Sequence, residues 1–367
     1  MLEDLNQKMV FLGGPRQVGK TTLATTLVPA REFQYLNWDL DEDRLDILKK
    51  QFAPNKALLI FDEIHKYKKW RNYLKGIYDV MKVGRTPERK ILVTGSARLD
   101  LYRFSGDSLQ GRYHFLRMHP LTLAETGGKT SKDLENLLQY SGFPEPFFQQ
   151  SGKELERWAK GYVTRLLRDE MTPLENVQDL GSMELLLHRL PDCVGSPLSI
   201  NSLREDLQVA HKTVARWLQI IERLYYVFRI SPLGGPKIKA VKQERKVYLY
   251  DWSRVQDEGA RFENLIAVHL NKYVQWLEDA EGRNVELRYF RDRDAREVDF
   301  VIVENKQPTH LIEVKRSDTV ISPSLKYLAA KYPKAKAYQL TMNPKHDFVS
   351  AEGIRLCSAE KFLVDLV

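Results

Sequence analysis

Residues near the start of the chain have the types and spacing of a site that binds phosphate groups. An apolar run ending at Leu12 leads into a loop bounded by glycines, then a lysine and threonines, and then a helix-like run at residues 22–27. This order, with the spacing G-x-x-x-x-G-K-[ST], is the P-loop pattern. Gly14 and Gly19 permit backbone conformations that turn successive amide groups toward one anion. The predicted nucleotide-binding residues are Gly14, Pro15, Arg16, Gln17, Val18, Gly19, Lys20, Thr21 and Thr22.

The same segment predicts how a nucleotide and its metal ion would be held. The side chain of Lys20 is long enough to reach the β- and γ-phosphates, and the hydroxyl of Thr21 is suited to ligate Mg²⁺. The positive end of the helix that follows adds to the attraction for phosphate. The sequence therefore predicts that the protein binds a nucleoside triphosphate, expected to be ATP, together with Mg²⁺.

Two acids follow the next apolar run, residues 57–61. Continuous apolar strands are typical of a parallel sheet covered on both faces, and an acid at the carboxyl end of such a strand lies at the ligand-binding edge. Asp62 then fits the partner of Mg²⁺, and Glu63 fits the group that polarises the attacking water. The alternative, an ordinary exposed acidic turn, is disfavoured by the P-loop upstream.

Two further positions complete the predicted hydrolysis site. The strand at residues 90–93 ends in small hydroxyls, and Ser96, or Thr94 in its place, is expected to hydrogen-bond the γ-phosphate or the attacking water. Such hydroxyls also form turns without any catalytic role. Arg112 precedes a strand-like run, where it would reach the γ-phosphate of a neighbouring subunit as an arginine finger. A solvated surface arginine explains the same residue, so both interpretations stay open.

These segments resemble those of prokaryotic AAA-type ATPases that carry a C-terminal domain of unknown function, DUF4143. The resemblance rests on residues 14–21, 61–65, 92–96 and 110–112 and covers essentially the whole chain. A later Gly-Phe-Pro-Glu segment, residues 142–145, is similar to a signature of that family. The Pro-Arg-Gln-Val filling of the P-loop is fairly specific.

Composition narrows the class of protein. The chain has 367 residues, enough for two or three domains, and a formal net charge of +8. Charged residues are frequent and hydrophobic ones ordinary, which is typical of a folded, soluble chain. No apolar run approaches the ~18 residues of a membrane span, and the start is not a signal peptide. Cys193 and Cys357 match no metal spacing, so we expect a cytoplasmic protein without a metal cluster.

The middle of the chain changes to helical patterns. Amphipathic helices are expected at residues 133–140 and 153–168, as the lid of the nucleotide site. Two short helices, at 198–209 and 213–224, with a tight connection between them form a helix-turn-helix pattern, and the strands that follow resemble the hairpin of a winged helix. Cations in and near the hairpin turn, Lys246 among them, suit DNA phosphates. The predicted DNA contacts are Thr213, Arg216, Lys237, Lys239, Lys242 and Arg245. Docking of a protein, or simple solvation of a basic loop, remains open.

The C-terminal part carries a second set of acids. Glu263 lies near the start of an apolar helix, Asp299 near the start of a strand, and Glu313 and Lys315 at the end of the next strand, where they project to the same side. An acid on a helix, an Asp, and Glu-x-Lys resemble the PD-(D/E)xK nuclease core. Glu263, Asp299 and Glu313 would hold Mg²⁺, and Lys315 would orient water or neutralise charge. A fold that only binds nucleic acid, a site that needs a partner, and simple ion pairs all remain open.

The predicted fold is therefore α/β: a P-loop AAA-type ATPase core at 1–125, a helical lid at 126–190, a winged helix at 191–252 and a nuclease-like α/β domain at 253–367. The predicted activity is ATP hydrolysis that gates or drives binding, remodelling or cleavage of DNA, with branched or forked DNA among the candidates. The alternatives are an ATP-switched DNA-binding protein or adaptor with an inactive nuclease fold, and a regulator that docks a protein. If Arg112 acts on a neighbour, a homo-oligomer, such as a ring, follows.

Overall fold

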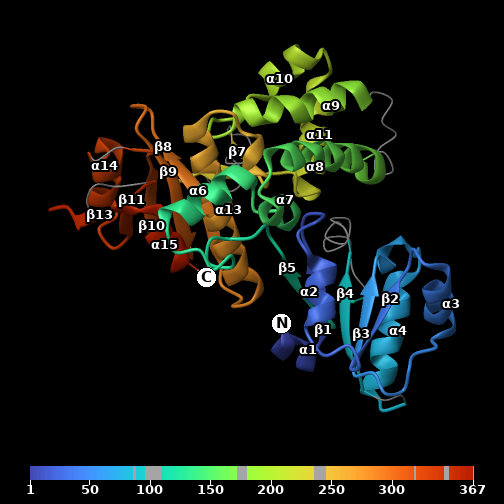
Figure 1. Cartoon of the computed structure of the whole chain (residues 1–367). Coiled ribbons are helices and arrows are strands. Elements are labelled where there is room, and N and C mark those ends of the chain that lie inside the picture. The colour runs from blue at the N-terminus through green and yellow to red at the C-terminus, as the bar shows by residue number, and fades with distance from the viewer. Residues whose placement is uncertain are drawn as a thin grey trace. The chain divides into compact units, whose positions relative to one another are not determined.

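The computed structural model of the chain describes residues 1–85, 88–95, 109–171, 180–234, 245–317, 320–342 and 347–366. The chain divides into two compact units, Met1–His119 and Pro120–Val367, and each is described by itself. Element labels are those of Figure 1. The first unit ends near the predicted end of the ATPase core at residue 125, and the second contains the segments predicted as lid, winged helix and nuclease-like domain.

The first unit is built on a parallel sheet with the strand order β2-β3-β4-β1-β5. The strands are β1 Met9–Gly13, β2 Phe33–Asn37, β3 Leu58–Asp62, β4 Lys90–Thr94 and β5 Tyr113–Arg117. The α-helices are α1 Leu2–Gln7, α2 Lys20–Thr26, α3 Asp41–Lys49 and α4 Trp70–Lys82, and a 3₁₀ turn, η1, covers Ile64–Lys66.

Both faces of this sheet are covered, as the continuous apolar strands predicted. Along β1, Met9 and Phe11 belong to one hydrophobic cluster, together with Leu74 of α4. The alternate residues Val10 and Leu12 belong to a second cluster on the other face. Because parallel strands end at a common edge, the P-loop after β1 and the acids at the end of β3 meet at that edge.

The second unit combines helices with a mixed sheet of the order β12-β13-β11-β10-β9-β8-β6-β7. Its strands are β6 Val227–Pro232, β7 Lys246–Leu249, β8 Val285–Arg291, β9 Glu297–Glu304, β10 Gln307–Val314, β11 Lys336–Thr341, β12 Phe348–Val349 and β13 Ile354–Ser358. Its α-helices are α6 Ser131–Tyr140, α7 Pro144–Gln149, α8 Gly152–Arg165, α9 Leu180–Arg189, α10 Ile200–Leu207, α11 His211–Arg223, α13 Glu258–Asp279, α14 Pro323–Lys331 and α15 Ala359–Val364. Short π or 3₁₀ turns occupy Leu166–Met171, Leu190–Cys193 and Trp252–Arg254.

The hairpin expected of a winged helix shares its sheet with the nuclease-like part. Strands β6 and β7 pair antiparallel, and the end of β6 pairs in parallel with β8 through Ser231 and Arg288. The predicted boundary at residue 252 is therefore not a break in the sheet. Helix α11 begins at His211, two residues before the predicted start at Thr213.

The Gly-Phe-Pro-Glu segment has a packing role in this unit. A Cβ on Gly142 would lie 2.6 Å from the indole of Trp252 and 2.7 Å from the carbonyl oxygen of Leu121, so no side chain fits there. Phe143 is fully buried against Trp158. The segment thus joins α7 and α8 to the buried indole of Trp252.

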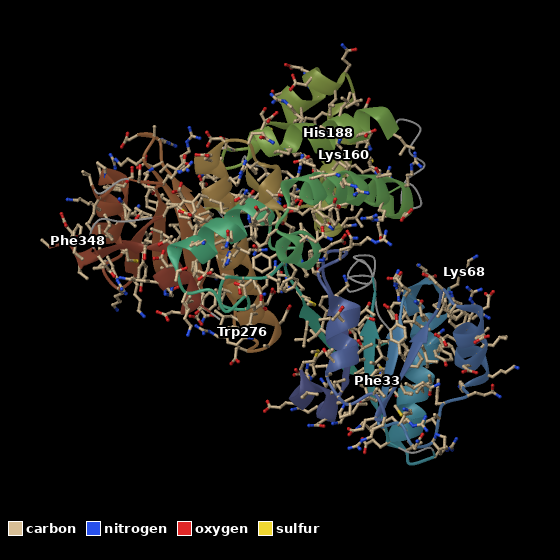
Figure 2. All side chains as sticks on the ribbon, viewed as in Figure 1. Phe33, Lys68, Lys160, His188, Trp276 and Phe348 are labelled. Carbon is tan, nitrogen blue, oxygen red and sulfur yellow. The ribbon has the colours of Figure 1, made fainter. Side chains whose placement is uncertain are left out.

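Some large apolar side chains remain at the surface. Trp276 of α13 and Phe348 of β12 are 41% and 40% exposed, and both are labelled in Figure 2. Within the described residues, none of the helices has the length and apolar character needed to cross a lipid bilayer.

Candidate nucleotide site and nuclease-like cluster

The P-loop adopts a backbone that depends on glycine at Gly14 and Gly19. Their φ angles are +130° and +94°, in the region that side chains disfavour. A Cβ on Gly14 would lie only 2.1 Å from the carbonyl oxygen of Met118, so the loop passes too close to the residue after β5 to carry a side chain there. Gly19 forms the N-cap of α2, and Val18 is buried beneath the loop.

Lys20 is directed back onto this loop. Its Nζ donates to the carbonyl oxygens of Gly14, at 3.1 Å, and of Pro15, at 2.5 Å. The residue is only 8% exposed, so its charge is held in place by the loop. Phosphate oxygens placed in the loop would meet an ammonium group that is already positioned.

Asp62 collects three hydroxyl donors at the end of β3. Thr21 donates to its Oδ2 at 3.1 Å, Tyr35 to the same oxygen at 2.5 Å, and Thr94 to Oδ1 at 2.8 Å. These bonds fix the orientation of a carboxylate that is 7% exposed. A threonine hydroxyl and a carboxylate side by side are the hard oxygen donors that Mg²⁺ takes beside phosphates, so the residues fit this ion.

The Thr94 hydroxyl is fully buried and donates to Asp62, which differs from the predicted contact to phosphate or water. Ser96 lies outside the described residues.

Sequence reasoning missed Tyr35, because its position on β2 gave no sign that its hydroxyl meets the end of β3. Burial and the neighbouring Asp62 raise the pKa of Tyr35, so it remains a hydrogen-bond donor.

Glu63 follows Asp62 with a left-handed backbone, φ +55°. Its Oε2 lies 3.1 Å from Nζ of Lys66 and 3.7 Å from Nε2 of His65. Lys66 also contacts Asp39, at 2.5 Å. Burial would lower the pKa of Lys66, but its bonds to Asp39 and Glu63 outweigh this and raise it. The predicted water-polarising carboxylate is therefore tethered to a lysine in this structure.

Arg112 lies at the other edge of the sheet. It immediately precedes β5, whose first residue Tyr113 pairs with Met9, whereas the P-loop leaves the far end of β1. Its Nε and Nη2 donate to the two carboxylate oxygens of Asp79 on α4, at 2.8 and 3.1 Å. The structure therefore does not bring Arg112 to the P-loop of its own chain, and the finger in a neighbouring site stays a prediction.

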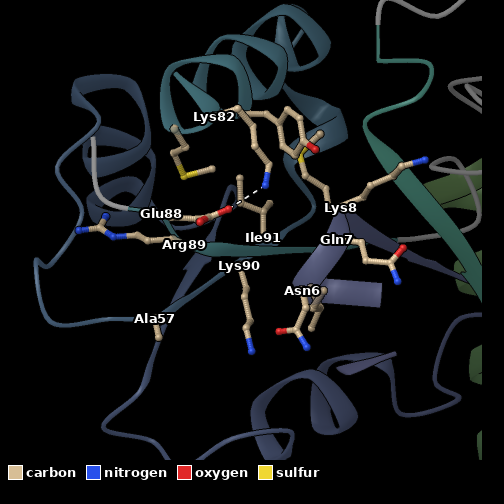
Figure 3. Close-up of a pocket in the computed structure, with 13 residues that line it drawn as sticks. Asn6, Gln7, Lys8, Ala57, Lys82, Glu88, Arg89, Lys90 and Ile91 are labelled. Carbon is tan, nitrogen blue, oxygen red and sulfur yellow. Dashed lines mark hydrogen bonds and ion pairs between the residues drawn. The ribbon is translucent and has the colours of Figure 1, made fainter. Parts of the chain in front are cut away.

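A basic pocket of about 280 Å³ also lies at this edge, at the starts of β1 and β4 (Figure 3). Its lining includes Lys8, Lys82, Arg89 and Lys90, and Lys82 is paired with Glu88 at 2.7 Å. It is separate from the P-loop edge because the strands run between them.

In the second unit the predicted nuclease residues come from three elements. Glu263 lies on α13, Asp299 on β9, and Glu313 and Lys315 at the end of β10. Oδ2 of Asp299 accepts from the backbone N–H of Val314 at 2.9 Å, and Lys315 Nζ lies 2.9 Å from Oε1 of Glu313. Burial raises the pKa of Glu263 and of Glu313 to about 7, and the charge of Asp299 adds to both shifts. The acids thus face a common interior.

Lys246, which the sequence placed among the cations of the wing, lies in this interior. Its Nζ is 2.6 Å from Oε1 of Glu297, 3.4 Å from Oε1 of Glu263 and 3.5 Å from Oδ1 of Asp299. The residue is 1% exposed. The sequence gave no sign of this role, because Lys246 directly follows a segment rich in lysine and arginine.

The donor set does not fit the predicted metal ion. Within the described ranges, no group of three or more His, Cys, Asp or Glu side chains is arranged to hold one. An ammonium group stands between Glu263 and Asp299, and Oδ2 of Asp299 is taken by a backbone donor. Oε2 of Glu313 is buried without a hydrogen bond, but the ammonium group of Lys246 already brings positive charge to the other acids of the set.

The predicted DNA contacts are only partly described. Lys237, Lys239 and Lys242 lie outside the described residues. Thr213 and Arg216 lie on α11, where Arg216 is exposed. Arg245 precedes β7 and is half-buried, and burial together with Arg229 lowers its pKa.

Three known families match consecutive segments of the chain. Residues 6–127 match an AAA domain, residues 131–255 a domain of unknown function named DUF8612, and residues 258–362 DUF4143. The chain thus matches an AAA domain in its first part and DUF4143 in its last part, as the resemblance predicted. Its fold is α/β, with a parallel sheet in the first unit and a mixed sheet in the second.

Curated relatives are themselves uncharacterized. A protein of Mycobacterium tuberculosis is 25% identical over 249 residues, which cover 66% of this chain and 54% of that protein. A protein of Methanocaldococcus jannaschii is 22% identical over 303 residues, which cover 68% of this chain and 62% of that protein. The chain therefore spans about half the length of the mycobacterial relative.

Three solved structures illustrate weaker similarity. A RuvB mutant of Thermotoga maritima has a TM-score of 0.31 at 15% identity and covers 60% of this chain and 82% of its own. Aeropyrum pernix Orc1 in complex with DNA has a TM-score of 0.30 at 15% identity, and the match covers 71% of this chain and 86% of the Orc1 chain. The replication initiator DnaA, bound to AMPPCP and single-stranded DNA, has a TM-score of 0.30 at 14% identity. The match covers 60% of this chain and 85% of the DnaA chain. At TM-scores of this size, none bears on what this chain binds.

Proposed function

We propose that the first unit hydrolyses ATP with Mg²⁺ and that the nucleotide controls DNA binding by the second unit. The observation that carries the ATPase assignment is the convergence of Thr21, Tyr35 and Thr94 on Asp62. These bonds hold the carboxylate of Asp62 in a fixed orientation beside the hydroxyl of Thr21. A Mg²⁺ ion that bridges the phosphates of a nucleotide needs such a pair of oxygen ligands.

In this proposal the loop residues bind and orient the triphosphate. Lys20 exchanges its two carbonyl partners for β- and γ-phosphate oxygens, and Thr21 and Asp62 hold Mg²⁺. The ion, when bound, neutralises charge on the phosphates. Glu63 leaves Lys66, whose ammonium lies 3.1 Å away, and accepts a hydrogen bond from the attacking water. In this proposal, hydrolysis begins when the side chain of Glu63 rotates from Lys66 toward the attacking water.

The DNA assignment rests on the exposed face of α11. Lys212, Arg216 and Arg223 are all exposed, at spacings of four and seven residues, which place them along one side of a helix. Helix α10 precedes α11 with only residues 208–210 between them, as in a helix-turn-helix. A stripe of cations on the second helix suits phosphate contacts along a duplex.

Phosphate release from ATP, with and without Mg²⁺, tests the first part. Lys20→Ala and Glu63→Gln are each expected to abolish turnover, whereas Lys68→Ala, at an exposed lysine in the same unit, keeps the wild-type rate (Figure 2). Wild-type turnover in either site variant would remove the ATPase assignment.

Binding to linear, forked and four-way DNA over a range of salt tests the second part. The double change Lys212→Ala with Arg216→Ala is expected to weaken binding and to flatten its salt dependence, because fewer counterions are released. Lys331→Ala, at an exposed lysine of α14, serves as the matched control. Absent or salt-insensitive binding would favour the rival function, an ATP-switched adaptor that docks a protein.

A further inference from the structure

Lys246 is buried, whereas the cations of a DNA-binding wing would be exposed at the surface. It is the first residue of β7 and is 1% exposed, and three carboxylates lie within 3.5 Å of its Nζ. The carboxylates come from α13 and from β9, which carries both Glu297 and Asp299. The ring of Tyr289 on β8 lies 5.6 Å from the same Nζ. The ammonium group is therefore enclosed on several sides by acceptors.

The chain encloses this lysine because β7 belongs to the same sheet as the acids. Strand β6 pairs with β8 and with β7, so the hairpin carries Lys246 toward β9 and α13. Residues before α10 pass over it, with bridges from Val194 to Val247 and from Pro197 to Lys246. A Cβ on Gly195 would lie 3.1 Å from the carboxylate of Glu263, which leaves little room for a hydrated ion on that side.

Three of the carboxylate oxygens that would coordinate an ion already accept from protein donors. Glu263 Oε1 accepts from the hydroxyl of Tyr248 at 2.6 Å as well as from Lys246. Asp299 accepts from Lys246 through Oδ1 and from Val314 through Oδ2. A divalent ion between them would meet the ammonium charge at close range, and the two cations repel.

Three carboxylates lie within 3.5 Å of the Lys246 Nζ, so its ammonium charge is paired inside the cluster. A buried charge is tolerated when it is paired in this way, and removing one partner leaves the others uncompensated.

We propose that the ammonium group of Lys246 takes the place of the divalent cation in this nuclease-like cluster, so that the cluster neither binds such a metal nor cleaves nucleic acid. The cluster then ties β7, β9 and α13 together as a permanent ion-pair centre. This role is independent of the proposed ATPase activity.

Calorimetric titration of the full chain with MnCl₂, without nucleotide, tests the proposal. The parent protein carries Thr21→Ala, which removes a predicted metal ligand of the nucleotide site. Its Mn²⁺ isotherm is expected to be the same with and without Asp299→Asn. Mn²⁺ binding to the parent that Asp299→Asn abolishes would overturn the proposal, as would Mn²⁺-dependent nicking of DNA that this change removes.

The complementary arm removes the lysine. Lys246→Ala in the same parent is expected to gain a site that binds Mn²⁺ at least roughly tenfold more tightly than the parent does, because the acids lose their cation. The melting temperature of this variant should then rise with MnCl₂ while that of the parent does not, since ligands stabilise the folded state that binds them. A folded Lys246→Ala protein that gains no Mn²⁺ site would contradict the proposal. If Lys246→Ala fails to fold, Lys246→Gln, which keeps a donor toward Glu297, takes its place in the same titration.

Discussion

The hydroxyl of Thr21 donates to Oδ2 of Asp62 across 3.1 Å, and this bond joins α2 to the end of β3. The two residues are far apart in the sequence and meet because β3 and the P-loop end at the same edge of a parallel sheet. Tyr35 donates to the same oxygen from the neighbouring strand β2. The orientation of Asp62 therefore depends on a residue that lies outside both sequence motifs.

Tyr35→Phe is expected to weaken binding of Mg²⁺-ATP by up to roughly tenfold. It removes one hydrogen bond to a charged group, which is worth about 1.5–3 kcal/mol, part of which Asp62 recovers from water. Equilibrium binding of a fluorescent ATP analogue with and without Mg²⁺ measures the effect. Tyr73→Phe removes a bond to the carbonyl oxygen of Ile47 in the same unit and should leave binding unchanged. Equal effects of the two changes would show that Tyr35 acts only through stability.

Gly14→Ala is expected to abolish nucleotide binding. The added Cβ would lie 2.1 Å from the carbonyl oxygen of Met118 at a φ of +130°, so the loop must move or remain strained by about 1–3 kcal/mol. Gly76→Ala on α4 is the matched control, because nothing lies within 4 Å of its Cβ, and it should stabilise the helix by roughly 0.5–1 kcal/mol. Chemical unfolding and ATP-analogue binding measure both. Normal binding by Gly14→Ala would show that the loop rearranges on nucleotide binding.

The sequence predicted the parts of the fold that depend on local pattern. Apolar strands before the P-loop and before Asp62 could be recognised because both faces of their sheet are covered. Helices α10 and α11 followed from apolar spacing, although α11 starts two residues before Thr213. Such features are properties of neighbouring residues, so they are visible along the chain.

The sequence did not predict which side chains meet across the sheet. Tyr35 is one residue in a half-buried strand, and Lys246 is one of several lysines near a turn. Their roles depend on strand order, which places β2 beside β3 and lets β6 carry β7 to β8. Because strand order is set by packing between distant segments, neither role has a signature in spacing.

Mixing two inactive proteins tests whether Arg112 completes a neighbouring site. Arg112→Ala is expected to reduce ATP turnover by roughly 10³-fold or more if it is a finger, and Lys20→Ala is inactive because it binds no phosphate. In a closed oligomer, a Lys20→Ala subunit still offers its Arg112 to an Arg112→Ala neighbour, so the mixture should regain part of the activity. Asp79→Asn, which releases Arg112 from its ion pair, should retain activity. No recovery on mixing, with equal loss of activity in Arg112→Ala and Asp79→Asn, would assign the pair a structural role.

The imidazole of His269 makes the second unit sensitive to acid. Its Nε2 accepts from the backbone N–H of Leu123 at 3.1 Å, and Nδ1 lies 2.8 Å from the carbonyl oxygen of Leu265, so the neutral ring uses both nitrogens. Burial lowers the pKa of His269 from 6.5 to about 4, and the charge of Lys272 adds to the shift. Protonation would place a charge in the core and break the bond to Leu123.

The folded protein therefore binds this proton less tightly than the unfolded chain does. The stability from His269 is fully present above a pH of about 6.5 and is lost as the pH falls toward 4, by up to about 3 kcal/mol. Urea unfolding of wild type and His269→Gln between pH 4 and 8 measures it, since other titrating groups cancel in the difference. The glutamine can keep an acceptor but does not titrate, so the stability of wild type relative to the variant should rise with pH up to about 6.5 and then stay level. A difference that is constant over the whole range would show that His269 keeps an ordinary pKa in the folded protein.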